Sequence, residues 1–227
     1  MAMRQINPAQ PLTTAAYQAL RESISTGALP AGARLIQSEL AERLGVSRLP
    51  IHEALQQLRQ EGFAIETGRR GLVVSALDPE FLLHLFELRA TLDRTAGRAA
   101  ARRRRAADGP RGLAMAERGR KGLVSRNLQT TAAADRDFHG LIYQMAGNPL
   151  ITAAAERIWH HVRRAFLTLI EITPELILFW EDHAAIMDAV MAGDEDRAGE
   201  LCWDHSIRSG LNYSGLARRQ AEALAAE

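Results

Sequence analysis

One stretch of the sequence decides the fold: Val46-Ser47-Arg48-Leu49-Pro50-Ile51-His52-Glu53-Ala54-Leu55. Its apolar residues recur at helical spacing, which predicts a helix with one buried face. Ser47 is expected to cap this helix, and Pro50 falls in the first turn, where its missing N–H costs little. Arg48 and His52 remain on the outer side, near the N-terminal end of the helix.

A shorter helix is predicted just before this stretch, over residues 38–44, with Ser38 at its N-cap and Gly45 as the turn. Two helices joined in this way form a helix-turn-helix, whose second helix enters the major groove of DNA. An ordinary pair of packed helices has the same pattern, and that alternative stays open here. If DNA is bound, the side chains that meet the bases are Ser47, Arg48, Leu49 and His52.

A β-hairpin is predicted directly after the second helix. Two β-prone runs, 63–67 and 72–75, flank the sequence Gly68-Arg69-Arg70-Gly71. A hairpin at this place is a wing, and its tip residues Arg69, Arg70 and Gly71 are expected to reach backbone phosphate or the minor groove. Residues 1–76 hold eight Arg and six Glu. DNA binding must therefore depend on where the arginines lie and not on bulk charge.

The composition is that of a soluble globular protein. The 227 residues, with 47% hydrophobic and 24% charged content, suffice for one large or two modest domains. Cys202 is the only cysteine, which excludes an intramolecular disulfide and a thiolate metal cluster. No apolar run reaches membrane-spanning length and residues 1–10 lack a signal-peptide core, so we expect no membrane partner and a cytoplasmic location.

The remainder of the chain is predicted to be helical. Asp78 and Pro79 begin a long helix at the boundary between two domains, 1–76 and 77–227. Further helices are expected near 111–126, 130–146, 150–171, 175–192 and 194–217, with no strand after Ser75. The prediction is a mainly α protein: a winged helix-turn-helix of three helices, the first beginning at about Thr13, plus a small β-hairpin, followed by an all-α bundle of about six helices.

Four side chains in the predicted bundle have the chemistry of metal ligands. Asp135 and His139 are four residues apart, and therefore lie on one face of a helix. His183 and His205 are predicted to point inward from two later helices. Together they would make a mixed nitrogen and oxygen site for Zn²⁺, Ni²⁺ or Mn²⁺. A single inward histidine is more often a hydrogen-bonded core residue, and only the fold can bring the four together.

Spaced positions through residues 12–76 agree with a known pattern: Ile24, Gly27, Leu29, Pro30, Gly32, Arg34 and Leu35, then Glu39-Leu40-Ala41-Glu42, Leu44-Gly45-Val46-Ser47-Arg48, Pro50, Glu53-Ala54-Leu55, Leu58 and Glu61-Gly62. The set resembles the winged-helix domain of GntR-family transcription regulators. The resemblance implies that double-stranded DNA is a partner and that Arg34 touches its backbone, although a solvated surface arginine is an equal alternative. The family usually has Arg at the position of His52.

A second set of motifs covers roughly residues 80–217: Glu87-Leu88-Arg89, Asp135-x-x-x-His139, Gly147-Asn148, His183 and His205. It resembles the FCD effector domain of the FadR-like branch of GntR regulators. The resemblance implies that Asp135, His139, His183 and His205 hold a divalent metal whose open positions take a ligand carboxylate. It also implies that Arg89 faces the effector pocket.

The expected function is a homodimeric regulator that binds a pseudo-palindromic operator and responds to a small carboxylic or sugar acid. Repression that the acid relieves is the commoner behaviour in the family that the chain resembles. Three alternatives remain open: a regulator that senses the metal itself, a metal-dependent enzyme fused to a DNA-binding domain, and a metal that is only structural. No further Glu or His stands near the four ligands at the spacing of a general base, so we expect no enzyme activity.

Overall fold

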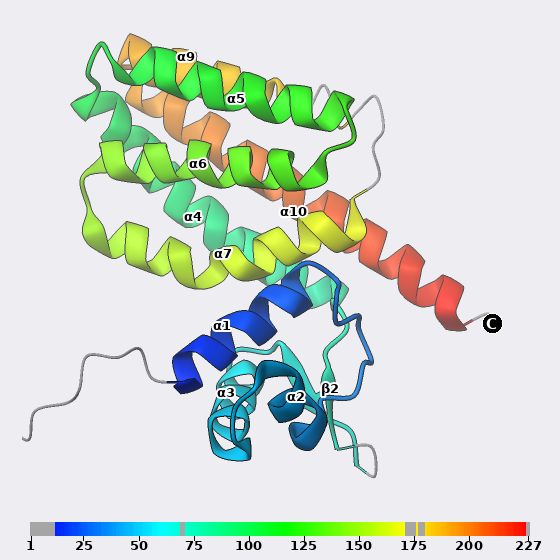
Figure 1. Ribbon diagram of the computed structural model, residues 1–227. Helices are drawn as coiled ribbons and strands as arrows, with labels where there is room; N and C mark the ends of the chain where they lie inside the picture. Colours follow the sequence, from blue (N-terminus) through cyan, green and yellow to red (C-terminus); the bar gives the residue numbers. More distant parts are fainter. Residues whose placement is uncertain (1–11, 69–70, 171–175, 177–179, 226–227) are drawn as a thin grey trace, which may run out of the picture. The chain divides into compact units, whose positions relative to one another are not determined.

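The computed structural model describes residues 12–68, 71–170, 176 and 180–225 (Figure 1). The chain divides into two compact units, Met1–Ala76 and Leu77–Glu227. The first unit combines three helices with a two-stranded antiparallel sheet, and the described residues of the second are helical throughout their regular elements. The predicted fold class, a winged helix-turn-helix followed by an all-α bundle, is confirmed.

The N-terminal unit is a winged helix-turn-helix. Its elements are α1 (Leu12–Ser25), α2 (Gln37–Leu44), α3 (Arg48–Gln60), β1 (Ala64–Glu66) and β2 (Leu72–Val74). Gly45 ends α2 in the left-handed conformation, with a φ of 66°, and makes the tight turn into α3. Ile51, Leu55 and Leu58 on the inner face of α3 are almost completely buried against α1 and the hairpin. The opposite face of α3 is left to solvent.

The prediction that Ser38 caps α2 is wrong. This helix begins at Gln37, and Ile36 holds the N-cap position without a side-chain hydrogen bond. The N–H of the preceding residue, Leu35, donates to the carbonyl of Leu72 at 2.9 Å, so pairing with the hairpin sets where the chain turns into the helix. Ser47 does occupy the N-cap position of α3, but its hydroxyl makes no capping hydrogen bond.

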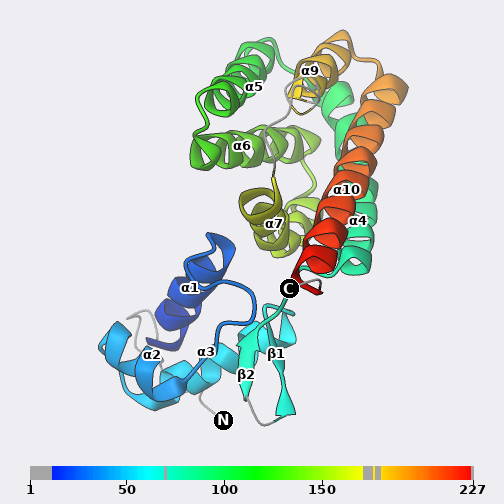
Figure 2. The same cartoon turned by 90° about the vertical axis from the view of Figure 1, so that its right-hand side faces the viewer.

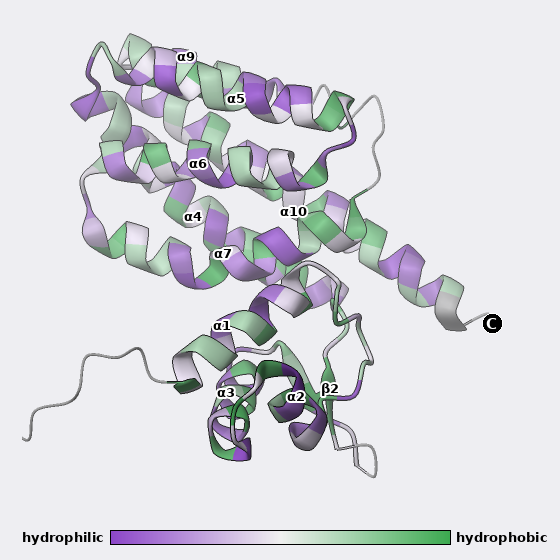
Figure 3. Cartoon of the chain, in the orientation of Figure 1, coloured by the Kyte–Doolittle hydropathy of each residue, from purple (hydrophilic) through white to green (hydrophobic). Residues whose placement is uncertain are grey.

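The C-terminal unit is a helical bundle. Its described helices are α4 (Pro79–Arg103), α5 (Asp108–Val124), α6 (Leu128–Ala146), α7 (Pro149–Leu169), α9 (Asp182–Ala192) and α10 (Glu195–Ala225). The two longest, α4 and α10, pack side by side (Figure 2). Asp78 caps α4 as predicted, since its carboxylate accepts from the N–H groups of Glu80 and Phe81. Hydrophobic and hydrophilic residues both occur along the helices, as an amphipathic bundle requires (Figure 3).

Some helix ends differ from the expectation. Helix α5 begins at Asp108 because this carboxylate accepts from the backbone N–H of Arg105 at 3.0 Å and thereby starts the helix early. Helix α10 continues beyond residue 217 to Ala225. Most of the predicted start of the helix over 175–192 lies outside the described residues. Among the described helices, none combines the length and the apolar character that crossing a membrane demands.

Candidate functional site

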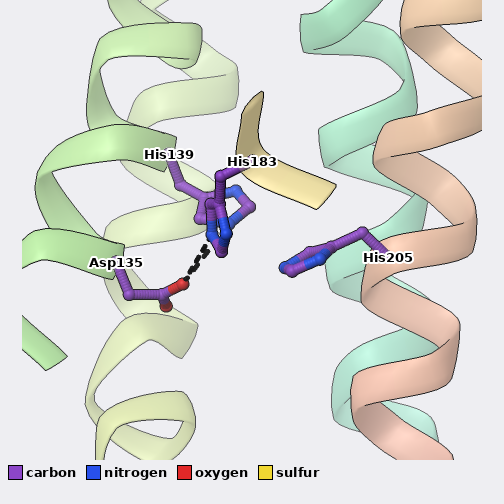
Figure 4. A group of neighbouring side chains, drawn as sticks. All are labelled: Asp135, His139, His183 and His205. Atoms are coloured by element: carbon purple, nitrogen blue, oxygen red, sulfur yellow. Dashed lines mark hydrogen bonds and ion pairs between the residues drawn. The ribbon is translucent and has the colours of Figure 1, made fainter. Parts of the chain in front are cut away.

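Three helices bring the four predicted metal ligands together inside the bundle (Figure 4). Helix α6 supplies Asp135 and His139, α9 supplies His183, and α10 supplies His205. One ligand atom from each residue lies within 4.8 Å of every other. The three histidines are at most 2% exposed, and the Asp135 side chain is 13% exposed. Residues separated by as many as 70 positions therefore form one compact and largely buried cluster.

Hydrogen bonds from outside the cluster fix two of the imidazole rings. Nδ1 of His183 lies 3.1 Å from the carbonyl oxygen of Trp180, and Nδ1 of His205 lies 3.2 Å from Oδ2 of Asp182. Both partners only accept, so in each neutral ring Nδ1 carries the hydrogen and Nε2 keeps its lone pair. This is the arrangement in which a histidine binds a metal through Nε2. Asp182 was not predicted from the sequence, because its position next to His183 gives no periodic signal.

Two ring nitrogens of the cluster approach the same oxygen of Asp135. Nε2 of His183 is 3.1 Å from Oδ1 of Asp135, and Nε2 of His139 is 3.6 Å from the same oxygen. The His139 Nε2 atom is buried and has no hydrogen-bond partner. Buried polar atoms are seldom left unpaired, because each costs roughly 1–3 kcal/mol. A cation bound between this nitrogen and the carboxylate would give the buried nitrogen a partner.

The electrostatics of the cluster favour an ionised Asp135 beside a neutral His139 and a neutral His205. Burial alone would raise the pKa of Asp135, but the close approach of His183 and the positive charge of Arg89 hold it well below its usual range. Burial lowers the pKa of His205 to about 4 and that of His139 well below its ordinary value. At neutral pH Asp135, His139 and His205 are therefore in the protonation state that metal binding needs.

The spacing of the ligand atoms fits a transition-metal ion. With metal–ligand bonds of about 2.1 Å, two ligand atoms on opposite sides of an ion are roughly 4.2 Å apart. The separations here reach no more than 4.8 Å. Small rotations of the four side chains would therefore bring their ligand atoms to bonding distance of an ion. One carboxylate and three imidazoles are a donor set that suits Zn²⁺, Ni²⁺ or Mn²⁺.

A second polar network lies behind the cluster and centres on Asp93 of α4. Its carboxylate accepts from Nε of Arg89 at 3.2 Å, from the hydroxyl of Tyr143 at 2.5 Å and from the hydroxyl of Ser206 at 2.6 Å. Nδ1 of His139 is 3.5 Å from the same carboxylate. The side chains of Arg89 and Asp93 are 3% and 1% exposed. This network was not predicted from the sequence, although the i,i+4 spacing of Arg89 and Asp93 was a usable signal.

Arg89 links this network to the cluster. Its Nε is held by Asp93, whereas its Nη2 lies 3.8 Å from Oδ2 of Asp135, beyond hydrogen-bond distance. Nη2 is buried and has no hydrogen-bond partner. The guanidinium carbon lies 4.9 Å from the centre of the Trp159 ring, a cation–π contact that holds the group in place. A fixed N–H donor thus remains open beside the ionised carboxylate.

The residues predicted to read DNA are exposed on the N-terminal unit. Ser47, Arg48, Leu49 and His52 lie at the beginning of α3, and Leu49 is 65% exposed although it is apolar. Gly71, with a φ of 69°, is exposed in the turn of the hairpin.

Of the three arginines predicted to contact DNA phosphates, the structure describes only Arg34. Arg34 is exposed, and its backbone forms an isolated β-bridge with Val73 beside the hairpin. Arg69 and Arg70 lie outside the described residues.

Comparison with known protein families identifies both units. The family model "Bacterial regulatory proteins, gntR family" matches residues 12–74, and the FCD domain model matches residues 84–208. A helix-turn-helix transcriptional regulator of Agrobacterium vitis is 32% identical over 133 residues, which is 56% of this chain and 75% of that protein. The probable D-xylose utilization operon transcriptional repressor of Paenarthrobacter nicotinovorans is 30% identical over 188 residues, which is 80% of each chain.

Solved structures support the fold. McbR/YncC of E. coli has a TM-score of 0.74 at 22% identity, with 94% of this chain and 100% of that chain covered. A putative GntR regulator from Rhodococcus sp. RHA1 has a TM-score of 0.73 at 22% identity, with coverage of 91% and 99%. The family and these relatives are transcription regulators and not enzymes. The chain belongs to the GntR family of bacterial transcription regulators and carries an FCD domain behind its winged helix.

Proposed function

We propose that this regulator represses transcription from a pseudo-palindromic operator, and that a small carboxylic or sugar acid bound at a divalent metal controls its affinity for DNA. One observation carries the metal site: the buried Nε2 atoms of His139 and His183 converge on one oxygen of Asp135, and no hydrogen-bond partner meets the first of them. His205 completes the set. When bound, the metal supplies Lewis-acidic positions that take the oxygen atoms of an acid.

Arg89 is the residue that we propose for the carboxylate of the acid. Its Nη2 is the open donor beside the cluster, and Asp93 holds the other edge of the guanidinium. A guanidinium pairs with a carboxylate through short, charge-assisted hydrogen bonds. The surroundings are buried, so one such bond contributes more than it does at a surface. This geometry favours a small anion over a neutral effector.

DNA recognition falls to α3 in this proposal. Ser47, Arg48, Leu49 and His52 enter the major groove, while Arg34 and the hairpin tip with Arg69, Arg70 and Gly71 contact the backbone. A twofold homodimer presents two such helices, which requires an operator with matching symmetry. The acid acts by binding one arrangement of the dimer better than the other. The word repressor in the name of the Paenarthrobacter relative supports the sign of regulation.

Metal content and acid response test the effector site together. The purified protein is melted against a panel of carboxylic and sugar acids, before and after chelation. We expect one acid to raise the melting temperature, and chelation to abolish that shift. His183→Ala and His205→Ala should each lose bound metal and acid response together. His84→Ala is the control, since this exposed histidine of α4 lies outside the cluster. Wild-type metal content in both variants would show that the ligand set is wrong.

Operator binding tests the other half of the proposal. Arg48→Ala should remove sequence-specific binding and leave the melting temperature unchanged, because the side chain is exposed. Arg197→Ala takes the same charge from an exposed position of α10 and should leave binding intact. Operator affinity that follows metal concentration with no acid present would instead identify a metal sensor.

A further inference from the structure

The exposed side chain of His52 has a hydrogen-bond partner on the neighbouring helix. Nε2 of Gln37, the first residue of α2, lies 3.2 Å from Nδ1 of His52 on α3. The amide nitrogen only donates, so Nδ1 is the acceptor. In the neutral ring the hydrogen must then be on Nε2. The outer edge of the imidazole therefore presents one N–H donor and no lone pair.

His52 is placed where such a donor meets DNA. It lies one turn after Arg48, so both side chains are on the same exposed face of α3. Both lie in the first turns of this helix, the part that reads base edges when a second helix docks in the major groove. The inference thus rests on the proposed docking of α3.

We propose that Gln37 and His52 act as one unit that reads a single purine in each half of the operator. Guanine and adenine both present N7 as an acceptor at the same place in the major groove, whereas the matching edge of a pyrimidine offers a methyl group or C–H. A single N–H donor can therefore bind N7 of either purine. It does not choose between them, because that choice needs a second contact at guanine O6 or adenine N6.

Gln37 is the positioning residue of the pair. Without its amide, the imidazole is free to rotate about its side-chain bonds and to place either nitrogen outward. An arginine at position 52 would present two donors in a fixed fork and bind N7 and O6 of guanine together. The pair therefore replaces a guanine-specific contact by a purine-specific one. The predicted gain of purine over pyrimidine is that of one hydrogen bond, roughly fivefold to tenfold in affinity.

Selection of binding sites from a random DNA library tests this assignment with the full-length protein. Wild type should enrich guanine and adenine about equally at one position of each half-site. His52→Arg should narrow that position to guanine. Gln37→Leu, which keeps the bulk and removes the donor, should lose the purine preference there and leave the other positions as they are. Gln60→Ala, at the far end of α3, is the control and should give the wild-type result.

Two results would overturn the inference and spare the docking model: a Gln37→Leu site identical with that of wild type, or a wild-type site with a single base at every half-site position. Failure of the wild-type protein to enrich any sequence would instead overturn the proposed docking of α3, and the pair with it.

Discussion

Nδ1 of His205 donates to Oδ2 of Asp182 across 3.2 Å, and this contact joins α10 to the first turn of α9. The same carboxylate oxygen accepts from Nη2 of Arg208 at 2.5 Å. Burial opposes ionisation of Asp182, but these two hydrogen bonds lower its pKa below the usual value. A fixed negative charge thus orients the imidazole so that its Nε2 points into the candidate metal centre.

Replacing this carboxylate should weaken the metal site and leave its ligands in place. We expect Asp182→Asn to lower metal affinity by about tenfold to a hundredfold, the usual cost of losing an outer partner of a ligating histidine. Competition with a chromophoric chelator measures the change. Asp188→Asn removes an exposed carboxylate from the same helix and should have no effect. Equal affinities in the two variants would mean that His205 needs no support from Asp182.

Removing Arg89 should destabilise the bundle by leaving a carboxylate unpaired. The side chain of Asp93 is 1% exposed, so Arg89→Met should cost roughly 3–5 kcal/mol in the free energy of unfolding. Urea unfolding, after a chelator has removed any bound metal, measures this loss of stability. Asp93→Asn removes the stranded charge, so the double variant should lose less stability than the sum of the two single variants. Additive losses would contradict a direct coupling of this pair.

Two helical glycines should respond oppositely to alanine. A Cβ on Gly119 of α5 would lie 1.8 Å from the indole of Trp180, whereas a Cβ on Gly140 of α6 meets no atom within 4 Å. Gly119→Ala should therefore lower the free energy of unfolding by about 1–3 kcal/mol through overpacking. Gly140→Ala should raise it by about 0.5–1 kcal/mol, since alanine favours the helix. Stability changes of the same sign in both would contradict the packing of α5 against Trp180.

The tyrosines should stay protonated in strongly alkaline solution. Burial raises the pKa of Tyr17 to about 12, and it raises the pKa values of Tyr143 and Tyr213 above the usual 10 as well. The unfolded chain releases these protons from about pH 10, and the folded chain retains them. Their contribution to stability is therefore complete below pH 10 and is lost as the pH rises.

Ultraviolet absorbance of tyrosinate follows this behaviour directly. The folded protein should show no tyrosinate signal at pH 10, and a denatured sample should be half ionised there. A signal from the folded protein near pH 10 would show that at least one of the three hydroxyls is open to water.

Local patterns predicted much of the fold, because turn residues and apolar periodicity act over short distances. Gly45 ends α2 in the left-handed conformation and Asp78 caps α4, as these residue types commonly do. Ser38 is different: the pairing of Leu35 with Leu72 decides where α2 begins, and no window of sequence around Ser38 contains that partner. Asp108 starts α5 through a bond to the backbone three residues earlier, which a proline two positions later made hard to foresee.

The candidate metal centre shows the same limit. Asp135 and His139 share a helix face, so their spacing alone pairs them. His183 and His205 join them only through the packing of α9 and α10 on α6. The supporting contacts also join distant positions: Asp93 reaches Ser206 across 113 positions, and Asp182 reaches His205 across 23. Contacts between such distant positions leave no periodic pattern in the sequence.

The indole of Trp180 lies 4.5 Å from the imidazole of His183, centre to centre, and its N–H donates to the carbonyl of Ala116 at 2.5 Å. Trp180 is thus an intrinsic fluorescent probe of the candidate metal centre. An ion with a partly filled d shell, such as Ni²⁺ or Mn²⁺, quenches the fluorescence of an indole at this range, and Zn²⁺, with its full shell, does not. Tryptophan fluorescence, to which Trp159 near His139 also contributes, would then distinguish Zn²⁺ from Ni²⁺ or Mn²⁺ in the bundle.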